Sequence, residues 1–200
     1  MYGNGAEYST MPLAAWVKRS LAAVLCGLPL ALYAAPDDIR EANRLYAQGQ
    51  TAAAAEKVKA ILAVNPRDSQ ARFLSGLILA GQNKTDDAIT IFTDLIADFP
   101  ELPEPYNNLA VLYASQGKYE LARGALETAI QTHPSYATAR ENLGDIHVQL
   151  AIRAYERAAQ LDKTNTSAAR KLMLIRQFSG AAPGAAPSSS ESSTAPVVAR

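Results

Sequence analysis

Cysteine, tryptophan and histidine are scarce in this sequence, which has one cysteine, one tryptophan and two histidines in 200 residues. A single cysteine excludes an internal disulfide framework, and the two histidines are not grouped with further metal ligands. Neither sign of charge is in excess, because 19 basic residues balance 19 acidic ones. This balance gives no electrostatic footprint for nucleic acid or for an anionic membrane surface. The 48% of hydrophobic residues suits one globular domain with extensions.

A long apolar run is also lacking. The longest one, over 20–35, contains Pro29 and is shorter than the stretch of about 20 residues that a membrane-spanning helix needs. It follows Lys18 and Arg19 and ends in small residues, which is the layout of a secretory signal peptide. We therefore predict a signal peptide over residues 1–35, with cleavage after Ala34 and with Met11 as the true start of translation. An uncleaved segment that anchors the chain in the inner membrane is the alternative.

Removal of the signal peptide would also remove Cys26 and leave a mature chain without a thiol. A chain of this kind suits an oxidising compartment, and we expect an exported protein of the bacterial periplasm. At the other end, residues 179–200 are rich in serine, alanine, proline and glycine and have no periodic apolar positions. Such a segment cannot bury enough surface to offset its ordering entropy, so we predict a disordered tail.

Between these ends, residues 36–178 repeat with a period of 34. Pro66, Pro100 and Pro134 recur at this period, and other positions align at the same spacing. We call a set of positions related by this offset a column. Small residues form two columns, and larger apolar residues form three: Ala42, Gly76, Ala110 and Gly144; Ala54, Ala88 and Ala122; Leu45, Leu79 and Tyr113; Val58, Phe92 and Leu126; Ile61, Leu95 and Ala129.

Each unit is predicted to be a pair of antiparallel amphipathic helices, because its apolar residues recur three and four apart. Gly49, Asn83 and Gly117 lie between the two halves of successive units, and these residue types tolerate the left-handed conformation that closes a helix. The small residues allow the two helices to approach closely. One unit cannot bury its apolar faces alone, so the units must stack.

The third unit resembles the tetratricopeptide repeat. It has an aromatic residue followed by Leu109-Ala110, Tyr113, Gly117, Ala122, Leu126 and Pro134 at the spacing of that family. The first and second units depart from the pattern. Where the family favours large apolar residues, the first unit has Asp38 and Glu41, and the second unit has Arg72 and Ser75. The resemblance implies an all-α solenoid of stacked antiparallel helix pairs.

The fourth unit has lost its turn. Leu143-Gly144 follows Leu109-Ala110 by one full period, but Tyr155 and Ala158 follow Leu126 and Ala129 by only 29, so five residues are missing. No glycine or proline lies between Gly144 and Ser179. We therefore predict one continuous helix from about residue 136 to residue 162 in place of a helix pair.

His147 falls in the column of Leu45, Leu79 and Tyr113, so we expect a buried or half-buried histidine with no chemical role. After Lys163, Asn165 can cap a last helix that runs to Phe178. We predict that this helix closes the end of the stack and turns a polar side outward.

The resemblance further implies that the first helices of the units line a concave groove that holds a peptide or helix of a partner protein. Helical spacing predicts its lining, apolar in the middle and acidic at one end, where it favours a basic partner: Ile39, Asn43, Tyr46, Phe73, Leu77, Asn107, Val111, Ser115, Glu141, Asp145 and Gln149. Another possibility is that these are ordinary surface positions and that the partner binds elsewhere.

An enzyme is the alternative of another class. The sequence offers no nucleophile with its base, no clustered metal ligands and no glycine-rich phosphate loop. Asp86 and Asp87 are explained as charges in the first turn of a helix. We therefore predict a non-catalytic adaptor or assembly factor of the bacterial envelope that has no cofactor and no metal and binds another protein.

Overall fold

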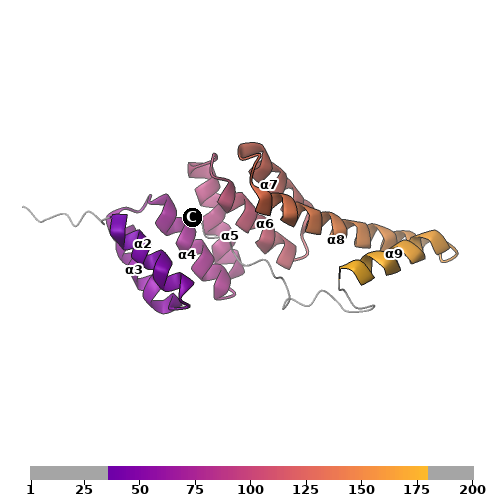
Figure 1. Ribbon diagram of the computed structural model, residues 1–200, viewed down its shortest axis with the longest axis horizontal. Coiled ribbons are helices and arrows are strands. Elements are labelled where there is room, and N and C mark those ends of the chain that lie inside the picture. The colour runs from indigo at the N-terminus through magenta and orange to yellow at the C-terminus, as the bar shows by residue number, and fades with distance from the viewer. Residues whose placement is uncertain (1–35, 180–200) are drawn as a thin grey trace, which may run out of the picture.

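The computed structural model describes residues 36–179, which form eight α-helices and no strand (Figure 1). The all-α prediction is confirmed, while the predicted signal peptide and nearly all of the predicted tail lie outside these residues. None of the helices over 36–179 is long and apolar enough to cross a membrane. In chain order they are α2 (Pro36–Ala47), α3 (Thr51–Val64), α4 (Ser69–Gly81), α5 (Thr85–Asp98), α6 (Pro103–Ser115), α7 (Tyr119–Thr132), α8 (Ala137–Leu161) and α9 (Thr166–Phe178).

The helices stack in chain order as three pairs followed by the long helix α8. Each first helix, α2, α4 or α6, packs mainly against the second helix of its own unit, and each second helix also packs against the first helix of the next unit. Figure 1 shows the stack extended along one direction, from α2 at one end to α9 at the other. This serial contact is the solenoid that the repeat period predicts.

Three turns close the helix pairs in the same way. Gly49, Asn83 and Gly117 have positive φ angles of 75°, 61° and 70°. In each turn the following residue donates its backbone N–H to a carbonyl five residues earlier, as Gln50 does to Leu45 at 2.9 Å. This is a Schellman closure, which requires one residue in the left-handed conformation and explains the glycine and asparagine at these positions.

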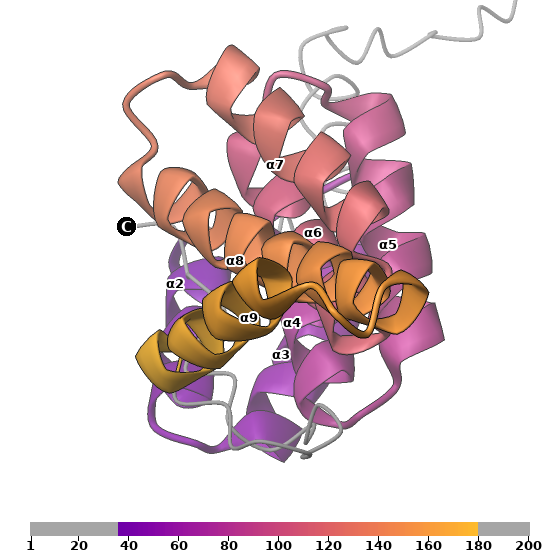
Figure 2. The same ribbon diagram turned by 90° about the vertical axis from the view of Figure 1, so that its right-hand side faces the viewer.

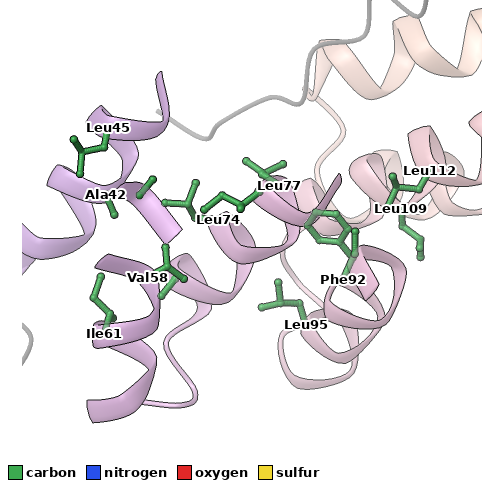
Figure 3. Close-up of a cluster of buried hydrophobic side chains, with 14 residues drawn as sticks. Ala42, Leu45, Val58, Ile61, Leu74, Leu77, Phe92, Leu95, Leu109 and Leu112 are labelled. Carbon is green, nitrogen blue, oxygen red and sulfur yellow. The ribbon is translucent and has the colours of Figure 1, made fainter. Parts of the chain in front are cut away.

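One cluster of buried apolar side chains runs from α2 to α6 (Figure 3), and a second joins α6, α7 and α8. Phe92 on α5 is fully buried, and its ring lies against Gly76 on α4. A Cβ atom added at Gly76 would come within 2.7 Å of two ring carbons of Phe92, so any larger residue at this position requires the ring or the helices to shift. The small residues of these columns are thus the positions at which a first helix packs closely against the second helix of its own unit.

Helix α8 is continuous over 25 residues, as the missing turn predicts. Aligning Leu150 with Gln116 and Ala151 with Ala122 shows that the absent residues correspond to 117–121, the turn glycine and the start of the second helix. Without this turn the second half of α8 cannot fold back. It leaves the stack beyond α7, and α9 packs along it (Figures 1 and 2).

Two predictions about this end of the chain are wrong. His147 is exposed, because no second helix folds back over its face of α8. The outer side of α9 is not uniformly polar, since Met173, Leu174 and Phe178 are 61%, 54% and 85% exposed. The cap at Asn165 is confirmed, because its side-chain oxygen accepts a hydrogen bond from the backbone N–H of Ala168 at 2.9 Å.

The packing of Gly76 on Phe92 gives a testable prediction. Gly76→Ala should lower the free energy of unfolding by about 1–3 kcal/mol, because the core must shift to admit the methyl group. Gly124→Ala, on α7, is the matched control, since its Cβ would meet nothing within 4 Å. That variant should gain about 0.8–1 kcal/mol from helix propensity. Urea denaturation measures both, and equal effects of the same sign would contradict this packing.

Candidate partner-binding surface

Nine of the eleven predicted groove residues are exposed or half-buried on the first helices of the four units. We call these nine the first-helix surface: Ile39, Asn43, Tyr46, Phe73, Val111, Ser115, Glu141, Asp145 and Gln149. They come from α2, α4, α6 and α8, which follow one another along the stack. Two shallow hollows in the described chain lie outside this surface, one between α3 and α4 and one at the α4–α5 turn.

Leu77 and Asn107 do not belong to this surface, because they are 0% and 1% exposed. Asn107 instead accepts a hydrogen bond at 2.8 Å through its Oδ1 from the Nδ2 of Asn142, between α6 and α8. Helical spacing predicts the side of a helix on which a residue lies, but not how far the neighbouring first helix overlaps that side. In this structure both side chains are buried inside the stack of helices.

The apolar part of the surface is fixed to the core. The ring of Phe73 lies 5.6 Å from that of Phe92, centroid to centroid, with a tilt of 54° between the planes. Tyr46 packs against the same cluster, and its hydroxyl donates to the carbonyl of Leu77 at 3.4 Å. Burial of this phenol raises the pKa of Tyr46 above its usual value. These rings are held in place and present only part of their faces to solvent.

The acidic part of the surface lies on α8. Glu141 and Asp145 are both exposed and are four residues apart, so their carboxylates lie on the same side of the helix. Among the other members, Ser115 donates its hydroxyl to the carbonyl of Leu112 at 2.7 Å, and Val111 and Gln149 are half-buried. The surface therefore changes from apolar and aromatic on α4 to anionic on α8.

The residues that break the repeat pattern in the second unit have structural roles that sequence reasoning missed. Arg72 forms an ion pair with Asp98, at the end of α5, and Arg67 reaches the same carboxylate at 3.0 Å. The hydrogen bond from Arg72 is the main reason that the pKa of Asp98 lies below its usual range. Ser75 stands in the column of Leu109, and its small side chain lines the hollow of about 470 Å³ between α3 and α4.

Tyr136 precedes α8 and has a hydroxyl that is buried without a hydrogen-bond partner. Burial, with a smaller contribution from the nearby Glu104 carboxylate, raises the pKa of this phenol to about 12. The hydroxyl is thus held neutral and is not positioned as an acid or base for a substrate. In residues 36–179 no group of three histidine, cysteine, aspartate or glutamate side chains is placed to hold a metal ion.

The sequence pattern of the tetratricopeptide repeat matches residues 39–103 and 107–170, which is more than half of the chain. The chain belongs to the tetratricopeptide repeat family. Members of this family generally use stacked helix pairs to mediate protein–protein interaction. No curated protein sequence matches the chain.

Solved structures with the same fold come from proteins of different kinds. TTC0263, a tetratricopeptide protein of Thermus thermophilus, is 21% identical, with a TM-score of 0.55 over 72% of this chain and 82% of that one. PilF of Pseudomonas aeruginosa is 19% identical, with a TM-score of 0.54 over 72% and 68%. An O-GlcNAc transferase of Thermobaculum terrenum is 19% identical, with a TM-score of 0.56 over 65% of this chain and 27% of that one. At these identities the likeness concerns the fold alone.

Because Asn107 is buried, its substitution should lower the stability of the fold. Asn107→Ala should cost about 1–3 kcal/mol of stability, because the buried Asn142 amide loses its acceptor. Replacing both residues by leucine should cost much less, since no polar group then remains unpaired. Urea denaturation of the single and double variants measures the difference. Equal losses in the two variants, or no loss in either, would contradict the buried pair.

Proposed function

We propose that this tetratricopeptide protein is a non-catalytic scaffold that binds a segment of another protein along its first-helix surface. The observation that carries the proposal is the change along this surface from partly exposed aromatic residues on α4 to two exposed carboxylates on α8. Aromatic side chains that are fixed by packing can anchor an apolar residue of a partner at little entropic cost. Exposed carboxylates favour basic residues in the bound segment.

The chemistry of the surface points to a peptide or helix with an apolar residue near Phe73 and basic residues near Glu141 and Asp145. The two carboxylates lie four apart on α8, where like charges disfavour the helix by about 0.2–0.5 kcal/mol. A basic segment would relieve this repulsion. Charge attraction of this kind favours the rate and the register of binding more than its final strength.

The N-terminal sequence supports export of this scaffold. Lys18 and Arg19 precede the apolar run over 20–35, which ends in small residues, as in a secretory signal peptide. The function would then be that of an adaptor or assembly factor in a bacterial envelope. If the segment is not cleaved, the same scaffold would be tethered to the inner membrane, and the mass of the N-terminus in the mature protein separates the two forms.

Photo-crosslinking in intact cells tests the binding surface. A photo-reactive amino acid at Val111 or at Asp145 should capture the same protein, because both positions belong to the first-helix surface. The same amino acid at Asp94 or Glu127, exposed on the second helices α5 and α7, should not capture it. Capture of one protein equally from all four positions, or from the second helices only, would contradict the proposal.

Charge reversal gives the matched affinity test. Asp145→Lys should weaken binding of the captured protein about tenfold, equivalent to about 1.4 kcal/mol, by repelling its basic residues. Asp94→Lys should leave the affinity unchanged. Because Asp145 is exposed, the far-ultraviolet circular dichroism and thermal midpoint of the variant should match those of the parent chain. If Asp145→Lys binds the captured protein with unchanged affinity, the acidic end of the surface is not part of the binding site.

A further inference from the structure

One face of α8 lacks the helix that covers the same face in every other unit. In this column of small residues Ala42 and Ala110 are 0% and 1% exposed, and Gly76 touches the ring of Phe92 on its own second helix. Gly144, in the same column, is exposed, and an added Cβ would meet nothing within 4 Å. His147 lies one turn further along and is exposed as well.

The helix that should cover this face exists, but it is displaced. Ala151, Tyr155 and Ala158 stand in the columns of Ala122, Leu126 and Ala129, which belong to the second helix of the third unit. In this unit they lie on the continuation of α8. Tyr155 is eleven residues from Gly144, about 16 Å along one straight helix. The two faces therefore cannot meet within a single chain.

The second half of α8 and the whole of α9 form an arm that projects from the stack (Figures 1 and 2). The main helix packing of α9 is against α8, with Arg176 paired to Glu156 and Lys171 over the ring of Tyr155. Exposed apolar side chains remain on this arm, among them Leu161 at 72% and Met173 at 61%. The arm presents a second-helix surface that packs against α9 but lacks the first helix of its own unit.

We propose that a second copy of this chain fills the gap, through a symmetric dimer in which two α8 helices pack antiparallel. Tyr155 of each copy would lie on Gly144 of the other, as Phe92 lies on Gly76 within the second unit. The two contacts are equivalent by a two-fold axis near residues 149 and 150. Loss of a hinge turn favours such an exchange of elements between copies, and the two-fold arrangement closes on itself.

The charges support a second copy as the occupant. Neighbouring first helices meet through Asn107 of α6 and Asn142 of α8. Glu141 corresponds to Asn107, one full period earlier, and Lys171 corresponds to Asn142 at the shortened spacing of the fourth unit. By analogy with the Asn107–Asn142 contact, α9 of one copy would bring Lys171 against Glu141 of the other. Both side chains are exposed. Because Lys171 lies over Tyr155, it is about 21 Å from Glu141 along α8 in a single chain.

Substitution of Gly144 tests the dimer without disturbing the single chain. By light scattering coupled to size-exclusion chromatography, the purified full-length chain should have twice the mass of one chain. Gly144→Leu should give a folded monomer with the helix content of the parent chain by far-ultraviolet circular dichroism, because the side chain enters open space and leucine favours a helix more than glycine does. Gly124→Leu, in open space on α7, should remain a dimer. A monomeric parent chain, or a dimeric Gly144→Leu variant, would overturn the proposal.

Two further variants examine the arrangement itself. Glu141→Lys or Lys171→Glu alone should raise the dissociation constant of the dimer about tenfold, whereas the double reversal should restore it. Insertion of Gly-Lys-Tyr-Glu-Leu between Leu150 and Ala151 returns the turn of the third unit and should yield a monomer whose own second helix covers Gly144. Failure of the double reversal to restore association, or a dimer that survives the insertion, would exclude this geometry. Glu141 also belongs to the first-helix surface, so partner capture at Val111 and Asp145 is compared in the Gly144→Leu variant, whose substitution lies outside that surface.

Discussion

Every helix of this protein has an apolar face that must be covered by a neighbour, and the close contact between the first and second helices of a unit provides that cover. The contact depends on one small residue, as at Gly76, against one large residue, as at Phe92. Burial of such side chains stabilises by roughly 1.5–3 kcal/mol each, but a single pair leaves its outer faces in water. Several stacked helix pairs are therefore needed to bury the apolar faces of the helices. A change in one turn alters which of these faces are buried.

The fourth unit shows this dependence most clearly. Loss of five residues removes the left-handed closure that Gly117 provides in the third unit. The helix then continues because nothing interrupts its hydrogen bonding, and Arg153 comes to lie over the ring of Tyr119 at 4.2 Å. The apolar columns of a second helix persist on the continuation, but their ordinary partner face is left in solvent. The face of the first half of α8 and the face of the second half, which correspond to faces that pack together in the other units, do not contact each other here.

Much of the fold could be predicted from the sequence, because the period of 34 and the residues at the turns report local geometry directly. The positive φ angles at Gly49, Asn83 and Gly117, the cap at Asn165 and the continuous α8 all follow from such local signals. Burial at the ends of the stack did not follow. His147 shares a column with buried and half-buried residues and is nevertheless exposed, since its burial depends on a neighbour that is absent.

For the candidate surface residues, the sequence predicted the side of the helix on which they lie but not their burial. Whether Asn107 faces a partner or the amide of Asn142 depends on how closely α6 and α8 approach, which periodicity within one helix does not encode. In the same way, Arg72 departs from the repeat pattern yet completes an ion pair with Asp98 at the end of α5. The first of these contacts joins two units and the second joins the two helices of one unit, so the periodicity of a single helix encodes neither role.

The continuity of α8 is the feature on which the account rests, and the distance between its two halves tests it most directly. Spin labels at positions 140 and 157, both exposed, should be separated by about 25 Å along a single helix of about 1.5 Å rise per residue. Pulsed electron resonance on labelled chains diluted with unlabelled chain measures this intramolecular distance. A narrow distribution centred on that separation, broadened by the label linkers, is the predicted result. A main distance of about 10 Å, as expected for two packed antiparallel helices, would contradict the account.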